Sequence, residues 1–219
     1  MEKMIWTKEK LWQGSVLASI AHAINIAHYP ELANEQSWDG FNYNVQDSSG
    51  TRGTITFHSN YFVAAFRNDH SKRLSNYINA QDYFRDAPYE VKELAANETL
   101  QYLLDDVNGN DVPLITTAVW GVDDIIYSQD EMKEIIAHGG FLLDRQSCDI
   151  EDALITWKEE YEMSEGQTNL LRQLFLRKLS NPSEIITMTK DEIQMIESVD
   201  EAGLEESRTS FDEIGIQWE

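Results

Sequence analysis

The 219-residue chain has few of the residues that carry redox, metal or linker chemistry. Its single cysteine, Cys148, excludes an intrachain disulfide and a cysteine-rich zinc site, and such cysteine usage is typical of a cytoplasmic protein. Cys148 precedes Asp149, whose carboxylate disfavours the thiolate, so the sequence does not favour Cys148 as a nucleophile. With only four prolines, the chain has no rigid proline-rich linker.

Basic residues are also scarce. The chain has 17 lysines and arginines against 39 aspartates and glutamates, a formal net charge of −22. Nucleic acids and anionic membranes both require a positively charged surface, so we expect direct binding to neither. A surface of this charge attracts basic partners and speeds the encounter with them, although the same charge also serves solubility alone.

Long apolar runs are missing. Residues 11–30 carry no Asp, Glu, Lys or Arg, but six polar side chains interrupt this segment, among them Gln13, Ser19 and Asn25. A secretory signal needs an uninterrupted apolar stretch of about 7–15 residues, and a membrane span needs about 20. We therefore expect neither export nor membrane insertion, and predict a cytoplasmic protein.

Sequence motifs that hold phosphates, metals or nucleophiles are absent as well. The chain has no G-x-x-x-x-G-K-[ST] or G-x-G-x-x-G loop, no G-x-S-x-G elbow and no H-E-x-x-H pair. Residues 106–111 partly resemble a calcium loop, but Gly109 is the fourth residue of the run instead of the sixth. An Asn-Gly turn between a helix and a strand explains the run better. We predict no cofactor and no metal.

The first half of the chain predicts one helix and then a meander. Residues 7–28 have a helix-capping residue, Thr7, and an apolar stripe at spacings of three and four. Residues 41–46 alternate between apolar and polar side chains, which is strand periodicity, and residues 53–58 and 61–67 predict two more strands. Their connections are too short for parallel crossovers, so at least three strands should form an antiparallel meander.

The second half is predicted to be largely helical. Pro88 begins one helix, which should reach Leu104, and Asp149 caps another. Three capping boxes mark further helix starts: Ser128 with Glu131, Ser164 with Gln167, and Thr189 with Glu192. Three short segments are candidate strands, and residues 203–208 suggest a loop. The tail is expected to dock back as an edge strand through Phe211, Ile214, Ile216 and Trp218. The candidate strands are residues 114–120, 141–143 and 184–188.

These elements predict the fold class α+β: an N-terminal helix, an antiparallel meander and a largely helical C-terminal half. The length of 219 residues suits a single domain, with a division into residues 1–85 and 86–219 as the alternative.

Polar side chains are densest on and around the meander. The cluster comprises Trp38, Asp39, Asn42, Asp47, Arg52, His58, Arg67, Asp69, His70 and Arg73. For an enzyme, His58, Asp69 and His70 would be the catalytic candidates, because a histidine beside a carboxylate can act as a general base. In such an enzyme, Arg67 or Arg73 would hold an anion. For a binding protein, the cluster supplies an aromatic anchor, an acid and three arginines. The candidate binding residues are Trp38, Asp39, Arg52, Arg67 and Arg73. The segment Asn68-Asp69-His70 is also a good turn.

No specific motif identifies a family. An acidic, cysteine-poor chain without a catalytic signature is similar, by class only, to bacterial toxin-immunity proteins, which neutralise basic partners, often nucleases. This resemblance favours an acidic binding protein, an immunity or inhibitor protein that masks a basic partner, over an enzyme. The alternatives are an enzyme of unrecognised class and a structural or scaffold subunit, since aromatic residues at 11% can also serve an oligomer interface. The sequence predicts no particular oligomeric state.

Overall fold

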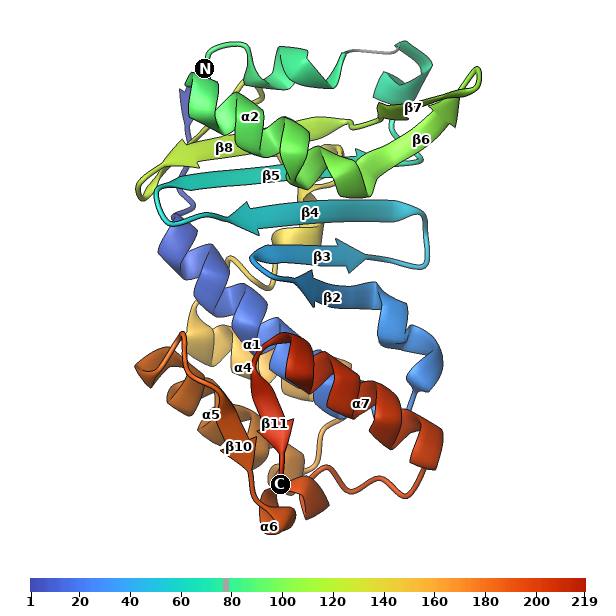
Figure 1. Ribbon diagram of the computed structural model, residues 1–219, viewed down its shortest axis with the longest axis vertical. Coiled ribbons are helices and arrows are strands. Elements are labelled where there is room, and N and C mark those ends of the chain that lie inside the picture. The colour runs from blue at the N-terminus through green and yellow to red at the C-terminus, as the bar shows by residue number, and fades with distance from the viewer. Residues whose placement is uncertain (77–78) are drawn as a thin grey trace. The chain divides into compact units, whose positions relative to one another are not determined.

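The computed structural model describes residues 1–76 and 79–219 (Figure 1). The chain forms two compact units, each built from two segments. Unit 1 contains residues 1–11 and 39–144, and unit 2 contains residues 12–38 and 145–219. The boundaries between these segments follow residues 11, 38 and 144, and none of the three lies near residue 85. That the chain is one domain remains a prediction.

Unit 1 contains six strands of a seven-stranded sheet, and the remaining strand, β2, begins in residues 36–38 of unit 2. The order β1-β9-β8-β5-β4-β3-β2 is that of an extended meander, and the pairs β3–β4, β4–β5, β5–β8 and β8–β9 are antiparallel. The predicted fold class and the three predicted strands are confirmed. The strands are β1 (Glu2–Lys3), β2 (Gln36–Asp39), β3 (Asn42–Gln46), β4 (Thr51–Phe57), β5 (Tyr61–Asn68), β8 (Thr117–Val122) and β9 (Ile125–Ser128).

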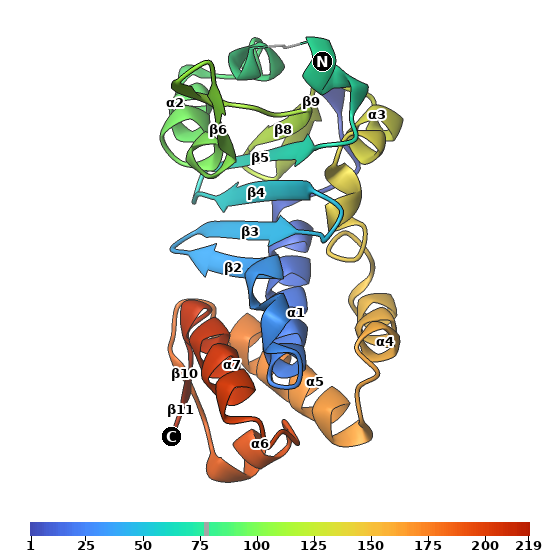
Figure 2. The same cartoon turned by 90° about the vertical axis from the view of Figure 1, so that its right-hand side faces the viewer.

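Alternation along the central strands gives the sheet an apolar layer on both faces. Val63 and Ala65 on β5 pack with Ala118 and Trp120 on β8 and with apolar residues of α2. The elements on this face are η3 (Ala80–Phe84), α2 (Tyr89–Asn97) and η4 (Thr99–Leu103). Figure 2 shows α2 on one face of the sheet and α3 (Met132–Ala137) on the other. The central strands are therefore covered on both sides, and their polar side chains gather at the strand ends.

The hairpins place their turns at two opposite ends of the sheet. At one end, the Phe57 amide donates to the Phe41 carbonyl over 2.9 Å, and the Asp123 amide donates to the Asn60 carbonyl over 2.8 Å. The turns at residues 40–41, 58–60 and 123–124 therefore lie together, as Figure 1 shows at the left. At the other end, the Asp69 amide donates to the Gly50 carbonyl over 3.2 Å, which joins the turns at residues 47–50 and 69–71.

A second hairpin in unit 1 explains the run that partly resembles a calcium loop. The strands β6 (Leu104–Val107) and β7 (Asn110–Pro113) pair antiparallel, with Val107 opposite Asn110. Asn108 and Gly109 between them have φ values of 57° and 82°, the left-handed pair that a two-residue hairpin turn requires. The Asn-Gly turn is confirmed, but it joins two strands and not a helix and a strand. The helix predicted to reach Leu104 ends at Asn97.

Unit 2 is mainly helical around its own apolar core. It contains most of α1 (Lys8–Ile26), η1 (Pro30–Glu35), α4 (Ile150–Glu160), α5 (Glu165–Ser180), α6 (Lys190–Gln194) and α7 (Glu201–Glu213), with the parallel pair β10 (Ile186–Met188) and β11 (Ile216–Trp218). Thr7 caps α1, because its Oγ1 accepts from the Lys10 amide over 3.2 Å. The capping boxes at Ser164 and Thr189 are present as predicted. The core includes Leu17, Trp157 and Phe211.

Three local predictions are wrong. Ser128 caps no helix: its hydroxyl donates to the Ala118 carbonyl across the sheet over 2.7 Å, and α3 begins after Glu131. Residues 141–143 form part of η5 (Gly140–Leu143), a turn entered through Gly139 at φ 128°. Residues 203–208 lie within α7, because Asp200 caps that helix. Gly203 also lets α7 approach the Ala27 carbonyl more closely than a Cβ atom would permit.

Within the described part of the chain, no helix is both long and apolar enough to cross a bilayer.

Candidate functional site

The structure divides the sequence-predicted site residues between the two ends of the sheet. His58 follows β4 at one end, whereas Asp69 and His70 follow β5 at the other. β5 has eight residues, which at about 3.3 Å per residue separates the two ends by about 25 Å. Asp69 and His70 are adjacent, but the three candidate catalytic residues are not brought together.

Arg67 lies at the end of β5, on the same face as the β6–β7 hairpin. Its Nε atom donates to Asp69 over 2.6 Å, and a terminal nitrogen binds Asp105. Burial lowers the pKa of the Arg67 guanidinium, but the hydrogen bonds to Asp105 and Asp69 outweigh burial and raise that pKa above its usual value. Arg52 lies opposite Arg67 on β4 and adds its charge to the field at Asp105. Arg67 thus serves an internal ion pair and not an external anion.

Within the described residues, the hydrogen bonds of His70 are to the two turns that meet at this end of the sheet. Its Nε2 atom lies 2.9 Å from the Ser49 carbonyl, and its amide donates to the Asn68 side chain over 2.9 Å. Asp69 is bound to Arg67, so it does not orient the His70 ring. These contacts favour the turn interpretation of Asn68-Asp69-His70 over the catalytic one.

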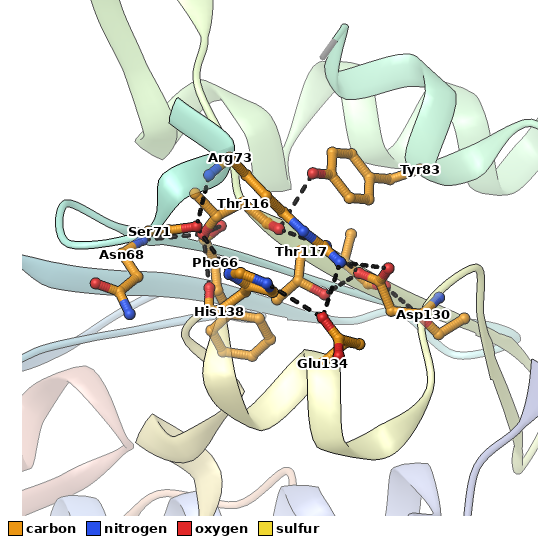
Figure 3. A network of polar contacts seen from close by, with 12 residues as sticks. Phe66, Asn68, Ser71, Arg73, Tyr83, Thr116, Thr117, Asp130, Glu134 and His138 are labelled. Atoms are coloured by element: carbon orange, nitrogen blue, oxygen red, sulfur yellow. Dashed lines mark hydrogen bonds and ion pairs between the residues drawn. The ribbon is translucent and has the colours of Figure 1, made fainter. Parts of the chain in front are cut away.

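Arg73 is the centre of the polar network shown in Figure 3. Its two terminal nitrogens bind the two carboxylate oxygens of Asp130 over 2.6 and 3.0 Å, and one of them also donates to the Thr116 carbonyl over 2.9 Å. The Thr117 hydroxyl donates to the same carboxylate over 2.7 Å, and Glu134 lies 3.5 Å from Arg73. Like Arg67, Arg73 is held by acids of its own unit.

The same network contains a serine, a histidine and a carboxylate in series. The Ser71 hydroxyl lies 2.8 Å from Nδ1 of His138, and Nε2 of His138 lies 3.3 Å from Glu134. The Ser71 oxygen also accepts from the Arg73 amide over 3.2 Å. An ionised Glu134 only accepts, so it favours the neutral His138 tautomer with its proton on Nε2, which leaves Nδ1 to accept from Ser71. This order of groups is that of a nucleophile, a base and an orienting acid.

The opposite end of the sheet carries aromatic rings and carboxylates. We call Phe41, His58, Tyr61, Asp123 and Asp124 the aromatic end. The His58 and Tyr61 rings are stacked, with centroids 5.5 Å apart and planes at 16°, and the Phe41 ring meets His58 edge-on at 6.3 Å. Phe41 is 40% exposed, and both aspartates are exposed. Sequence reasoning missed Phe41 and Tyr61, because it explained both as strand residues, Phe41 by alternation and Tyr61 as the first residue of a strand.

The other two candidate binding residues have internal roles. Trp38 is half-buried against the core of unit 2, and its Nε1 atom donates to the Ser19 hydroxyl over 2.7 Å. Trp38 and Ser19 line a shallow pocket with His22 and Glu213. Asp39 accepts from the Tyr102 hydroxyl over 2.6 Å. Burial and then this hydrogen bond raise the pKa of Tyr102 to about 12. The predicted aromatic anchor is thus better supplied by the aromatic end than by Trp38.

No group of three or more His, Cys, Asp or Glu side chains within residues 1–76 and 79–219 has the arrangement of a metal site. No protein-family model, curated protein or solved structure matches this chain, so its sites are argued from its own geometry.

Proposed function

We propose that the chain is a cytoplasmic binding protein that masks a basic partner, and that the aromatic end is its contact surface. The observation that carries this proposal is the arrangement of the exposed ring of Phe41 and the stacked rings of His58 and Tyr61 beside two exposed aspartates. Aromatic side chains concentrate binding energy at interfaces, and carboxylates around them select a basic partner.

The charge of the chain supports the same function. Unit 1 carries 10 basic and 19 acidic residues, a net charge of −9, and unit 2 carries 7 and 20, a net charge of −13. Both units therefore attract a cationic protein over distances of about 10 Å at moderate salt. Negative charge on both units speeds the encounter without choosing a contact site, and the aromatic end would supply that choice.

The first experiment compares two variants with equal loss of charge. The tagged protein captures its partner from an extract of its host, and the purified partner is then titrated. We expect Asp123→Asn with Asp124→Asn to weaken binding about tenfold, as hot-spot residues do. Glu205→Gln with Glu206→Gln, on exposed positions of α7, should change the association rate slightly and the affinity less than threefold.

Two results would contradict this function. The first is a captured partner that is not basic or whose affinity does not fall as salt rises. The second is an equal loss of affinity in both double variants, which would mean that only net charge matters. Both asparagine replacements are compatible with the fold, since asparagine tolerates the φ of 53° at Asp123 and can accept the hydrogen bond that Asp124 accepts from Glu9.

A second proposal is ester hydrolysis at Ser71, which the series Ser71–His138–Glu134 favours. Ser71 Oγ would attack the ester carbonyl carbon while its proton passes to Nδ1 of His138. His138 would return that proton to the leaving alkoxide, and water would then release the acid from the serine. Ser71 is only 8% exposed, which limits this chemistry to small acyl groups.

A fluorophosphonate probe and p-nitrophenyl acetate test this second function. We expect one covalent adduct on Ser71, located by peptide mass spectrometry, and slow release of p-nitrophenol. His138→Gln should reduce both by about 100-fold, in the range of general-base effects, while Ser75→Ala should change neither. Absence of an adduct after prolonged exposure at high probe concentration would remove Ser71 as a nucleophile.

A further inference from the structure

We propose that the aromatic end recognises an arginine side chain of its partner, and not simply positive charge. This inference rests on the proposed masking function and names the group that is masked. The guanidinium would lie on the exposed Phe41 ring and on the accessible parts of the half-buried His58 and Tyr61 rings, and would bind the carboxylates of the neighbouring turn.

The rings are held in place by the backbone of the turn between β4 and β5. His58 stacks on Tyr61, three residues later, and its Nδ1 atom accepts from the Asn60 amide over 3.3 Å. That hydrogen bond places the proton of the neutral His58 ring on Nε2. Because the rings are already ordered, binding costs little side-chain entropy. A planar, weakly hydrated guanidinium stacks on such rings better than a compact, strongly hydrated ammonium does.

The carboxylates lie on the adjacent turn, which is tied to the first. The Asp123 amide donates to the Asn60 carbonyl over 2.8 Å, and Asp124 accepts from the Glu9 amide over 3.2 Å. Within the described residues, neither aspartate is in an ion pair, whereas the acids beside Arg67 and Arg73 are. A carboxylate has about four lone-pair sites, so Asp124 retains capacity for a guanidinium.

One cation already lies at this end of the sheet. Lys8 donates from Nζ to the carbonyls of His58 and Ser59 over 3.3 and 2.6 Å, and no carboxylate pairs with it within residues 1–76 and 79–219. The turn carbonyls thus hold an ammonium, while the carboxylates of Asp123 and Asp124 remain for a second cation. Asp123 and Asp124 outnumber Lys8, so the local charge favours a cation. Removing the charge of Lys8 should strengthen arginine binding, since like charges repel.

The experiment titrates the full chain with two peptides, acetyl-Gly-Arg-Gly-amide and acetyl-Gly-Lys-Gly-amide, followed by NMR of backbone and aromatic signals. We expect the arginine peptide to shift the signals of His58, Tyr61 and Asp123 and to bind about threefold to fivefold more tightly than the lysine peptide. Asp123→Asn with Asp124→Asn should remove most of this binding. Lys8→Met should strengthen it about twofold.

Each failure has a distinct meaning. Equal binding of both peptides, or shifts spread over α7 as much as over the aromatic end, overturns arginine recognition. Absence of any shift at millimolar peptide overturns it as well. If the peptides fail while the captured partner still depends on Asp123 and Asp124, masking stands and only the arginine assignment falls. If the arginine peptide binds as expected but the partner is indifferent to both aspartates, recognition stands and masking at this surface falls.

Discussion

Asp130→Ala should lower the free energy of unfolding by about 3 kcal/mol, near the lower limit for breaking a buried ion pair. The side chains of Arg73 and Asp130 are only 21% and 13% exposed, and two hydrogen bonds join them. Without Asp130, the Arg73 guanidinium keeps the Thr116 carbonyl and a longer contact with Glu134, but it loses its main compensating charge. The Thr117 hydroxyl also loses its acceptor.

A matched pair in unit 2 isolates the effect of burial. Arg172 and Glu151 form the same two-pronged contact, over 2.8 and 2.9 Å, but their side chains are 46% and 70% exposed. Glu151→Ala should therefore cost less than about 1 kcal/mol. Urea unfolding of both variants measures the two costs at a common m-value. Equal costs would show that Arg73–Asp130 behaves as a surface pair, and a more stable Asp130→Ala protein would show that Asp130 strains the site.

Local sequence patterns predicted correctly those elements that are determined by neighbouring residues. The three strands of the meander were predicted, the first of them from alternation. Two of the three expected capping boxes form, because a capping box depends on residues within one turn. Ser128 failed because its hydroxyl found the Ala118 carbonyl across the sheet, a partner that no helix-start pattern contains. The prediction of a loop at residues 203–208 was wrong for a similar reason. Gly203 does not interrupt α7 but allows this helix to pack closely against the Ala27 carbonyl.

The candidate site required long-range information. His58 and His70 are twelve positions apart and looked like neighbours, yet a hairpin places them at opposite ends of a strand. Conversely, Ser71 and His138 are 67 positions apart and meet because β5 pairs with β8, whose partner strand β9 leads into α3. The pairing of β5 with β8 skips the β6–β7 hairpin, and no periodicity in the sequence specifies that register.

Acid should destabilise the protein between pH 6.5 and pH 4 through His22. This residue lies on α1, is 1% exposed, and has one polar contact within the described residues, 3.5 Å from its Nε2 atom to the Ala33 carbonyl. Burial lowers the pKa of His22 to about 4, and the hydrogen bond to Ala33 opposes that change only in part. In the unfolded chain the pKa of His22 is 6.5. Between pH 6.5 and pH 4 the unfolded state therefore binds more protons than the folded state, and the free energy of unfolding decreases as the pH is lowered.

The expected loss is about 3 kcal/mol over the whole interval, from about 1.4 kcal/mol per unit of pKa difference. Carboxylates also titrate near the lower limit, so the measured quantity is the difference between the unfolding free energies of the natural protein and of His22→Gln. From pH 7.5 to pH 4, the natural protein should lose about 3 kcal/mol more of its unfolding free energy than His22→Gln does. His70→Gln, which replaces an exposed histidine, is the control for the substitution itself. A flat difference for His22→Gln would mean that His22 takes up its proton in the folded state, and hence that the helices around α1 admit water in acid.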